Sequence, residues 1–183
     1  MVELSPRNII AGLSGYAVPP LLPIPVLRLI PMISSTVSLQ WAIDEYQFLS
    51  SWLPPTDPQK ANDLLPQWFR SWGPKSTMVL FTSFPFSAGA GFTNLYNLRN
   101  TPWTLDGAKT FYALGTALAF GHMVFGPKAL GLLKKIRNGE PDGRPTESLG
   151  VWLKMHVFRT VVTDLPAVVC FLVAAVKAGQ GEY

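Results

Sequence analysis

The sequence predicts an all-α membrane protein in which four transmembrane helices form a bundle with a polar interior. Charged residues make up only 14% of the 183 residues, against about 25% in soluble domains. Hydrophobic residues make up 48% and the mean hydropathy is +0.23. Four segments are each long and apolar enough for a membrane span, which needs roughly 20 residues. Each of them also gathers its polar residues on one helical face.

The composition excludes several classes of function. The net charge of +4 is too small and too dispersed for a nucleic-acid-binding surface. The single cysteine, Cys170, rules out an intramolecular disulfide and a cysteine-rich metal site. We therefore expect no nucleic-acid partner and no metal site.

The chain reads as one membrane domain at residues 28–178, with a proline-rich interfacial segment at residues 1–27 and a short tail at residues 179–183. Prolines such as Pro19 and Pro20 make the N-terminal segment a poor signal-peptide core. The first span is the most polar of the four. The spans are expected at about residues 28–49, 76–96, 109–130 and 152–175.

The three connections differ in composition. Residues 50–75 mix prolines, tryptophans and cations, which is typical of the membrane–water interface, so we expect an interfacial loop. Residues 97–108 predict a short turn. Residues 131–151 are basic and contain Asn-Gly and Asp-Gly pairs, so we expect a solvated loop. The first and third connections hold most of the Lys and Arg, and the positive-inside rule then places both termini in the lumen.

Polar side chains within the spans are the candidates for function, because they are costly in a bilayer and turn inward. By depth, we expect Glu45, His122, His156 and Arg159 to form one layer with Asp164 beneath it. Arg159 and Asp164 are five residues apart, about 140° around an α-helix, so each is expected to pair with another helix. Further inward-facing residues are Trp41, Ser83, Ser87, Asn94 and Asn97.

Each candidate also has a purely structural interpretation. The Ser and Asn stripe of the second span is typical of interhelical packing. Arg159 and Asp164 can form structural ion pairs. Glu45 and His156 lie near helix ends, where interfacial side chains are common. Because these groups cluster in one layer, a functional site is favoured over the case in which every one of them has only a structural role.

Several motifs together resemble the anthrone-oxygenase-like family of small fungal four-helix integral membrane proteins. The motifs are Phe120–Pro127, Trp152–Arg159, Asp164–Ala167, Trp41 with Glu45, and Leu65–Trp68. The likeness covers most of the chain after about residue 28. The proline-rich N-terminal segment departs from the family pattern.

The resemblance implies an enzyme of secondary metabolism that oxygenates a lipophilic, aromatic, polyketide-like intermediate, as in the oxidation of anthrone to anthraquinone. It implies molecular oxygen as co-substrate, no cofactor, and a location in the endoplasmic reticulum. The expected partners are a lipophilic small molecule and membrane lipid.

Oxygenation without a cofactor needs a base that forms a substrate anion, and a neutral histidine suits this role. We expect His122 or His156 to be the base and Arg159 to stabilise the anion. Asp164 or Glu45 would orient an imidazole. The substrate-binding candidates are Trp41, Ser83, Ser87, Asn94 and Asn97.

Three other functions remain open at the level of sequence. A membrane-bound cyclase or isomerase would need the same acid and base groups but no oxygen. His122 and His156 could be axial ligands of a haem. A non-catalytic subunit of a homo-oligomer or a larger membrane complex would use the polar stripes as interfaces.

Overall fold

The computed structural model describes residues 22–53, 57–100 and 106–180, and these residues form helices and short connections without a strand. The all-α expectation is thus confirmed for this part of the chain. The elements are α2 (Ile24–Ser50), α3 (Pro58–Leu98), α4 (Asp106–Gly121), η2 (His122–Phe125), α5 (Gly126–Asn138), α6 (Pro145–Arg159), η3 (Thr160–Asp164) and α7 (Leu165–Gln180).

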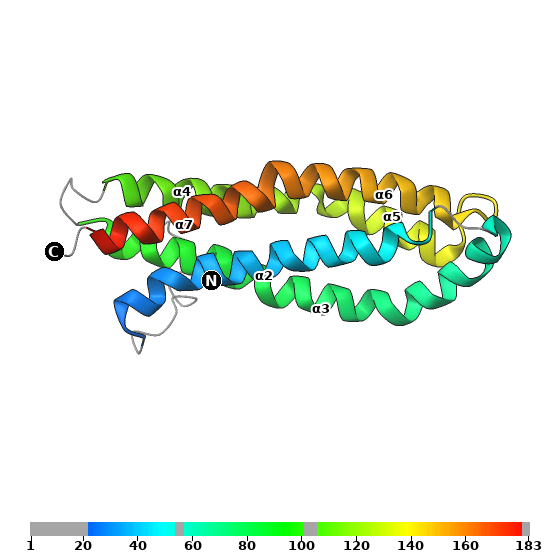
Figure 1. Ribbon diagram of the computed structural model, residues 1–183, viewed down its shortest axis with the longest axis horizontal. Coiled ribbons are helices and arrows are strands. Elements are labelled where there is room, and N and C mark those ends of the chain that lie inside the picture. The colour runs from blue at the N-terminus through cyan, green and yellow to red at the C-terminus, as the bar shows by residue number, and fades with distance from the viewer. Residues whose placement is uncertain (1–21, 54–56, 101–105, 181–183) are drawn as a thin grey trace, which may run out of the picture.

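These elements form four long rods, because α4, η2 and α5 follow one another without a break, as do α6, η3 and α7. Figure 1 shows the rods side by side in an elongated bundle. The helix α2 packs against α3 and α7, and α4 packs against the other sides of α3 and α7. The start of α2 and the end of α7 therefore lie at one end of the bundle, and the connection from α5 to α6 lies at the other (Figure 1).

The prediction of an interfacial loop at residues 50–75 is wrong, because α3 already begins at Pro58. The Asp57 side chain accepts a hydrogen bond from Lys60 N at 3.2 Å, and proline at the first helical position suits a helix start. Pro66 and Pro74 lie inside α3. A proline within a helix is costly, but this stretch buries Leu65 and Phe69 in the core, which offsets the cost. Residues 54–56 lie outside the described residues.

The solvated loop expected at residues 131–151 shrinks to the six residues between α5 and α6. The helix α5 runs to Asn138 and ends at Gly139, whose φ of 76° lies in the left-handed region that favours glycine. The next helix begins at Pro145. Lys134, Lys135 and Arg137 are helical rather than looped, because a helix can expose lysines on one side while burying Ile136 on the other. Arg144 remains in the connection, directly before α6.

The ends of the other elements also differ from expectation. The first helix starts at Ile24 rather than residue 28. Most of the expected N-terminal segment (residues 1–21), the centre of the turn after α3 (residues 101–105) and the last residues of the tail (181–183) lie outside the described residues.

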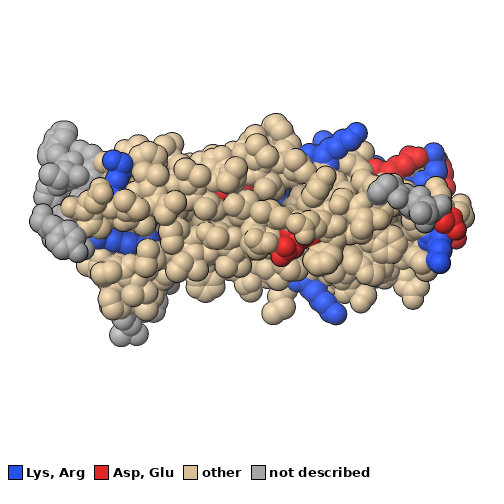
Figure 2. Space-filling model, viewed as in Figure 1, with Lys and Arg blue, Asp and Glu red and all other residues tan. Residues whose placement is uncertain are grey.

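Three of the four rods are long and apolar enough to cross a membrane: Ile24–Ser50, Gly107–Asn138 and Pro145–Gln180. This is consistent with an integral membrane protein. The rod α3 is long enough, but serine, threonine and glycine lower its hydropathy, so a four-span bundle is not confirmed. The central surface carries little charge, whereas charged side chains gather at the α5–α6 end (Figure 2).

The core has two apolar clusters with a polar layer between them. One cluster lies at the α5–α6 end and includes Leu49, Phe69 and Ile136. The other lies at the α7 end and includes Tyr112 and Phe171. On every rod the buried polar residues of this layer lie between the residues of the two clusters. These polar residues are Glu45, Ser76, His122, His156 and Arg159. The polar layer is therefore enclosed on both sides along the bundle axis.

Candidate functional site

All five residues expected to do chemistry lie in the polar layer. Four of them are buried, and the fifth is almost buried. Glu45, His122, His156 and Arg159 expose at most 9% of their surface, and the Asp164 side chain exposes 10%. Charged groups at such depth need partners, since removing them from water is expensive. The structure provides these partners within the layer itself.

His122 forms a dyad with Asp164 across two rods. Its Nδ1 lies 2.8 Å from Asp164 Oδ1, and because an ionised carboxylate can only accept, Nδ1 carries the proton. The Thr163 hydroxyl lies 3.1 Å from the same oxygen, and the Phe84 ring packs 5.1 Å from the imidazole. Within the described residues Nε2 has no hydrogen-bond partner. This nitrogen is free to exchange a proton with a ligand.

His156 has no free nitrogen. Arg159 Nη2 lies 2.8 Å from its Nδ1, and a guanidinium can only donate, so Nδ1 accepts. Its Nε2 lies 2.8 Å from the Ala42 carbonyl oxygen, which can only accept, so Nε2 donates. The ring also stacks on Trp152 at 4.6 Å. These bonds fix His156 as a neutral tautomer that positions Arg159, and they leave His122 as the base candidate.

The expectation that Arg159 and Asp164 would each pair with a different helix is only half right. Asp164 does reach His122 on another rod, but Arg159 Nε also lies 3.7 Å from Asp164 Oδ2. The cause is the π-helical turn η3, in which the Leu165 N–H bonds to the Thr160 carbonyl. A π-turn places residues five apart on nearly the same face, which an α-helix does not. Such turns are frequent at functional sites.

The backbone of the opposite rod is also irregular at this level. His122 begins the tightened 3₁₀ segment η2 between α4 and α5, and η3 packs against both α4 and α2. Both partners of the His122–Asp164 dyad thus lie at departures from regular α-helix. These departures aim the two side chains at each other.

Glu45 lies in the layer as expected, but it does not hydrogen-bond to either imidazole, so Asp164 is the carboxylate that holds one of them. Glu45 Oε1 accepts a hydrogen bond from Ser76 Oγ, and Glu45 Oε2 lies 3.9 Å from His156 Nδ1. Ser76 was missed because it stands at the start of an expected span. It shares its helical face with Ser83, seven residues on, which is the signal that could have found it.

Several buried donors around the layer lack a hydrogen-bond partner among the described residues, although one of them, Arg159 Nε, forms an ion pair with Asp164 at 3.7 Å. They are Trp41 Nε1, Trp152 Nε1, Arg159 Nε and Thr160 Oγ1. Buried donors without partners are rare in native proteins. An oxygen-bearing ligand would satisfy them, and Arg159 Nε adds a positive charge.

The expected substrate-binding residues of α3 are used largely in packing. Ser83 accepts a hydrogen bond from Ser38 at 2.8 Å, and Ser87 donates to Ser34 at 2.9 Å. Asn94 Nδ2 donates to the carbonyl of Leu27 at 2.9 Å. Asn97 is exposed near the end of α3, away from the polar layer.

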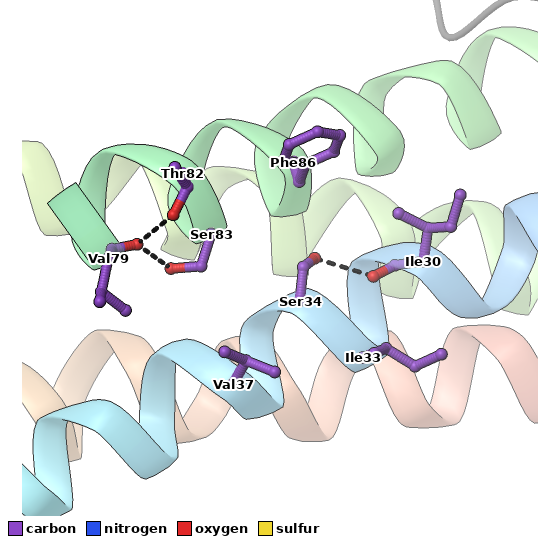
Figure 3. A pocket seen from close by; sticks show the side chains of 8 residues that line it. All are labelled: Ile30, Ile33, Ser34, Val37, Val79, Thr82, Ser83 and Phe86. Atoms are coloured by element: carbon purple, nitrogen blue, oxygen red, sulfur yellow. Dashed lines mark hydrogen bonds between the residues drawn. The ribbon is translucent and has the colours of Figure 1, made fainter.

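An apolar groove of about 350 Å³ lies between α2 and α3 (Figure 3). The hydroxyls of Ser34, Thr82 and Ser83 at its edge all bond to carbonyl oxygens of their own helix, as Figure 3 shows for Ser34 on Ile30. The groove thus offers hydrocarbon rather than free polar groups to an occupant. The groove residues are Ile30, Ile33, Ser34, Val37, Val79, Thr82, Ser83 and Phe86.

Metal and haem binding find little support in the donor geometry. Across the described residues, no group of three or more His, Cys, Asp and Glu is placed to hold a metal ion. Ligation of haem by two histidines needs a free nitrogen on each ring. His156 has both nitrogens engaged, so the pair does not fit that role.

The chain is similar to three curated fungal proteins over most of its length. It is 38% identical over 157 residues to the probable epoxidase scpX of Mollisia scopiformis, covering 84% of this chain and 96% of the relative. It is 37% identical over 157 residues to the epoxidase pydX of an Acremonium species, covering 86% and 96%. It is 36% identical over 153 residues to the epoxidase gkaX of Penicillium citrinum, covering 84% and 94%. No family model and no solved structure matches the chain.

Proposed function

This chain belongs to the family of the three fungal epoxidases, and from that membership we propose that it is a membrane-embedded oxygenase of secondary metabolism. Its substrate is a lipophilic, polyketide-like intermediate that carries a carbon–carbon double bond. Molecular oxygen is the co-substrate, and no bound cofactor takes part. The endoplasmic reticulum is the proposed location. The observation that carries the proposal is the buried dyad of His122 and Asp164, whose imidazole keeps one free nitrogen.

The chemistry begins with His122. Its Nε2 takes a proton from an acidic C–H or O–H of the substrate, while Asp164 holds the ring in the required tautomer and stabilises the imidazolium. The resulting carbanion or enolate combines with O₂ and regains a proton, so that R–H and O₂ give R–O–O–H. The outer oxygen of this hydroperoxide then adds to the double bond, which leaves an epoxide and an alcohol. The substrate itself supplies the electrons.

Arg159 is the proposed stabiliser of the substrate anion. Its Nε is buried without a hydrogen-bond partner among the described residues, and its Nη2 is held by His156. A fixed donor in a site without water stabilises a developing negative charge more than a mobile one does. His156 acts through Arg159 and is a positioning residue in this scheme.

The groove between α2 and α3 is the proposed approach for the apolar part of the substrate. Half of its lining residues belong to α2, which is long and apolar enough to cross a membrane. On α3, Ser83 lines the groove, and the next residue, Phe84, packs on His122. In this proposal a substrate dissolved in lipid enters the bundle through the groove and does not cross water.

Deletion of the gene in the producing fungus, followed by complementation, tests the proposal. The deletion strain should accumulate a lipophilic intermediate with less oxygen than the final product, as read by mass spectrometry. Wild-type protein should restore the product, and His122→Ala should not, at equal protein level in the membrane fraction. Asp44→Asn is the matched control, because Asp44 bonds to Gln40 on its own helix and not to the polar layer. Conversion of the intermediate at the full rate without oxygen would contradict an oxygenase and indicate a cyclase or isomerase.

A further inference from the structure

We propose that the polar layer holds one mobile proton in addition to those fixed by its hydrogen bonds, and that Glu45 carries this proton in the resting protein. Glu45 would then be a buried carboxylic acid that stores a proton for the reaction. The use of that proton rests on the proposed oxygenase function. The presence of the proton does not, and can be tested without turnover.

The first step is a count of charges in the layer. Arg159 is always positive. The Arg159 guanidinium lies 3.7 Å from Asp164, and the Thr163 hydroxyl donates to the same carboxyl group, so Asp164 is a carboxylate that balances Arg159 and accepts a hydrogen bond from His122 Nδ1. His156 is neutral because one nitrogen accepts and the other donates. The net charge therefore depends on Glu45 and His122 alone.

An uncompensated charge at this depth is expensive, so the layer favours neutrality. Other charged groups near it do not compensate, because Lys75, Lys128 and Lys154 are exposed and Asp44 bonds to Gln40. Neutrality requires one proton shared by Glu45 and His122. Either Glu45 is an acid beside a neutral His122, or Glu45 is ionised and His122 is an imidazolium.

The surroundings of Glu45 favour the acid. A buried carboxylate is stabilised by several donors, but Glu45 has one complete hydrogen bond among the described residues, from Ser76. The Trp41 indole N–H faces the same carboxyl group without completing a second hydrogen bond. The second oxygen of Glu45 faces His156 Nδ1 at 3.9 Å, and that nitrogen presents a lone pair already used by Arg159. Two acceptors facing each other repel, and a proton on Glu45 Oε2 removes this repulsion.

The stored proton completes the proposed reaction without changing the charge of the layer. His122 takes one proton from the substrate as the anion forms. The anion and O₂ give R–O–O⁻, which receives the proton of Glu45 to become R–O–O–H. The His122 imidazolium then returns its proton to the Glu45 carboxylate. Each step keeps the sum of buried charges constant.

Infrared spectroscopy of the resting full-length protein in lipid vesicles, without any substrate, tests the proposal. The C=O stretch of a protonated carboxylic acid should be present in the wild type and absent in Glu45→Gln. Asp44→Asn, which neutralises the neighbouring carboxylate on α2, should keep the band. Absence of the band from the wild type, or its loss in Asp164→Asn but not in Glu45→Gln, would overturn the proposal.

A second variant keeps the test decisive if Glu45→Gln fails to fold. Ser76→Ala removes the hydroxyl that bonds to Glu45, so the acid band should shift; an unshifted band would assign the proton to another group. Where Glu45→Gln folds and substrate is at hand, its turnover should fall about 100-fold, and full turnover would remove Glu45 from the reaction. A wild-type band in a protein that shows no oxygenation would refute the proposed function and leave the proton store standing.

Discussion

His122 and His156 lie in the same layer but differ in what their nitrogens can do. Asp164 holds one nitrogen of His122 and leaves the other without a partner among the described residues, whereas Arg159 and the Ala42 carbonyl occupy both nitrogens of His156. A base needs an available lone pair, and a positioning residue needs none. The two histidines should therefore respond differently to the same substitution.

Replacement of His122 by Gln should lower kcat by about 10²–10⁴-fold and change the thermal midpoint little, because the ring contacts one carboxylate and one aromatic neighbour. His156→Gln should lower the thermal midpoint clearly, since it removes the stack on Trp152 and two buried hydrogen bonds. Initial rates and thermal unfolding in the same lipid measure both. Equal losses of kcat at unchanged stability for the two variants would contradict the division of roles.

Asp164→Asn should reduce kcat at least about 100-fold, because a neutral amide neither stabilises the imidazolium nor balances Arg159. Steady-state kinetics should place the loss in kcat rather than in KM, since Asp164 contacts His122 and not the substrate. The control Asp44→Asn should stay within about twofold, as expected for a partly exposed side chain outside the layer.

At the scale of elements, the π-turn η3 brings Arg159 and Asp164 together, and it amounts to one extra residue in an otherwise α-helical rod. Deletion of the exposed Val162 should convert the π-turn to regular α-helix. The buried faces of α6 and α7 should both still point into the bundle. The bundle should still fold, with the circular-dichroism spectrum retained, but turnover should fall at least about 100-fold. Deletion of Val169 in regular α7 should instead prevent folding. Full activity after deletion of Val162 would show that the π-turn is dispensable.

The α7-end cluster depends on a close approach between helices at Gly115. A Cβ there would lie 2.8 Å from the ring of Phe171, which is fully buried. Gly115→Ala should therefore cost about 1–3 kcal/mol, measured by denaturant unfolding in detergent. Gly89→Ala has no neighbour within 4 Å and should be neutral or slightly stabilising, because alanine has the higher helix propensity. A loss of the same size for both would indicate a backbone effect rather than the Phe171 contact.

The expected helices and the polar layer followed from hydrophobic periodicity, because charged residues in apolar helices turn inward. Two features did not. The prolines of residues 58–75 suggested a loop, although α3 accommodates Pro66 and Pro74 by burying Leu65 and Phe69. The Arg159–Asp164 contact requires a π-turn, which no pattern of residue types specifies. The pattern of residue types along the sequence could thus predict which residues share the polar layer, but not which of their side chains contact each other.

At the scale of the molecule, the distribution of charge predicts an orientation in the membrane. Lys and Arg side chains gather near the α5–α6 connection, where Asp and Glu side chains also lie, and the start of α2 and the end of α7 lie at the opposite end (Figures 1 and 2). The positive-inside rule counts the Lys and Arg residues. By the positive-inside rule the basic end faces the cytosol. The polar layer then lies within the bundle, between two apolar clusters.

Glycosylation mapping checks this orientation, because the natural sequence has no Asn-x-Ser/Thr acceptor. An acceptor placed after Gln180 should be glycosylated in microsomes, and one placed between Gly139 and Arg144 should not. Sensitivity to a glycosidase identifies the modified form. Glycosylation of the second acceptor alone would invert the predicted orientation.

The central claim is that the enclosed layer around His122 performs an oxygenation. The most direct measurement is incorporation of ¹⁸O from ¹⁸O₂ by the purified protein in lipid, using the intermediate that accumulates in the deletion strain. The wild type should place labelled oxygen in the product, and His122→Gln should form almost none of that product. An unlabelled product, or labelled product formed at the wild-type rate by His122→Gln, would contradict the account.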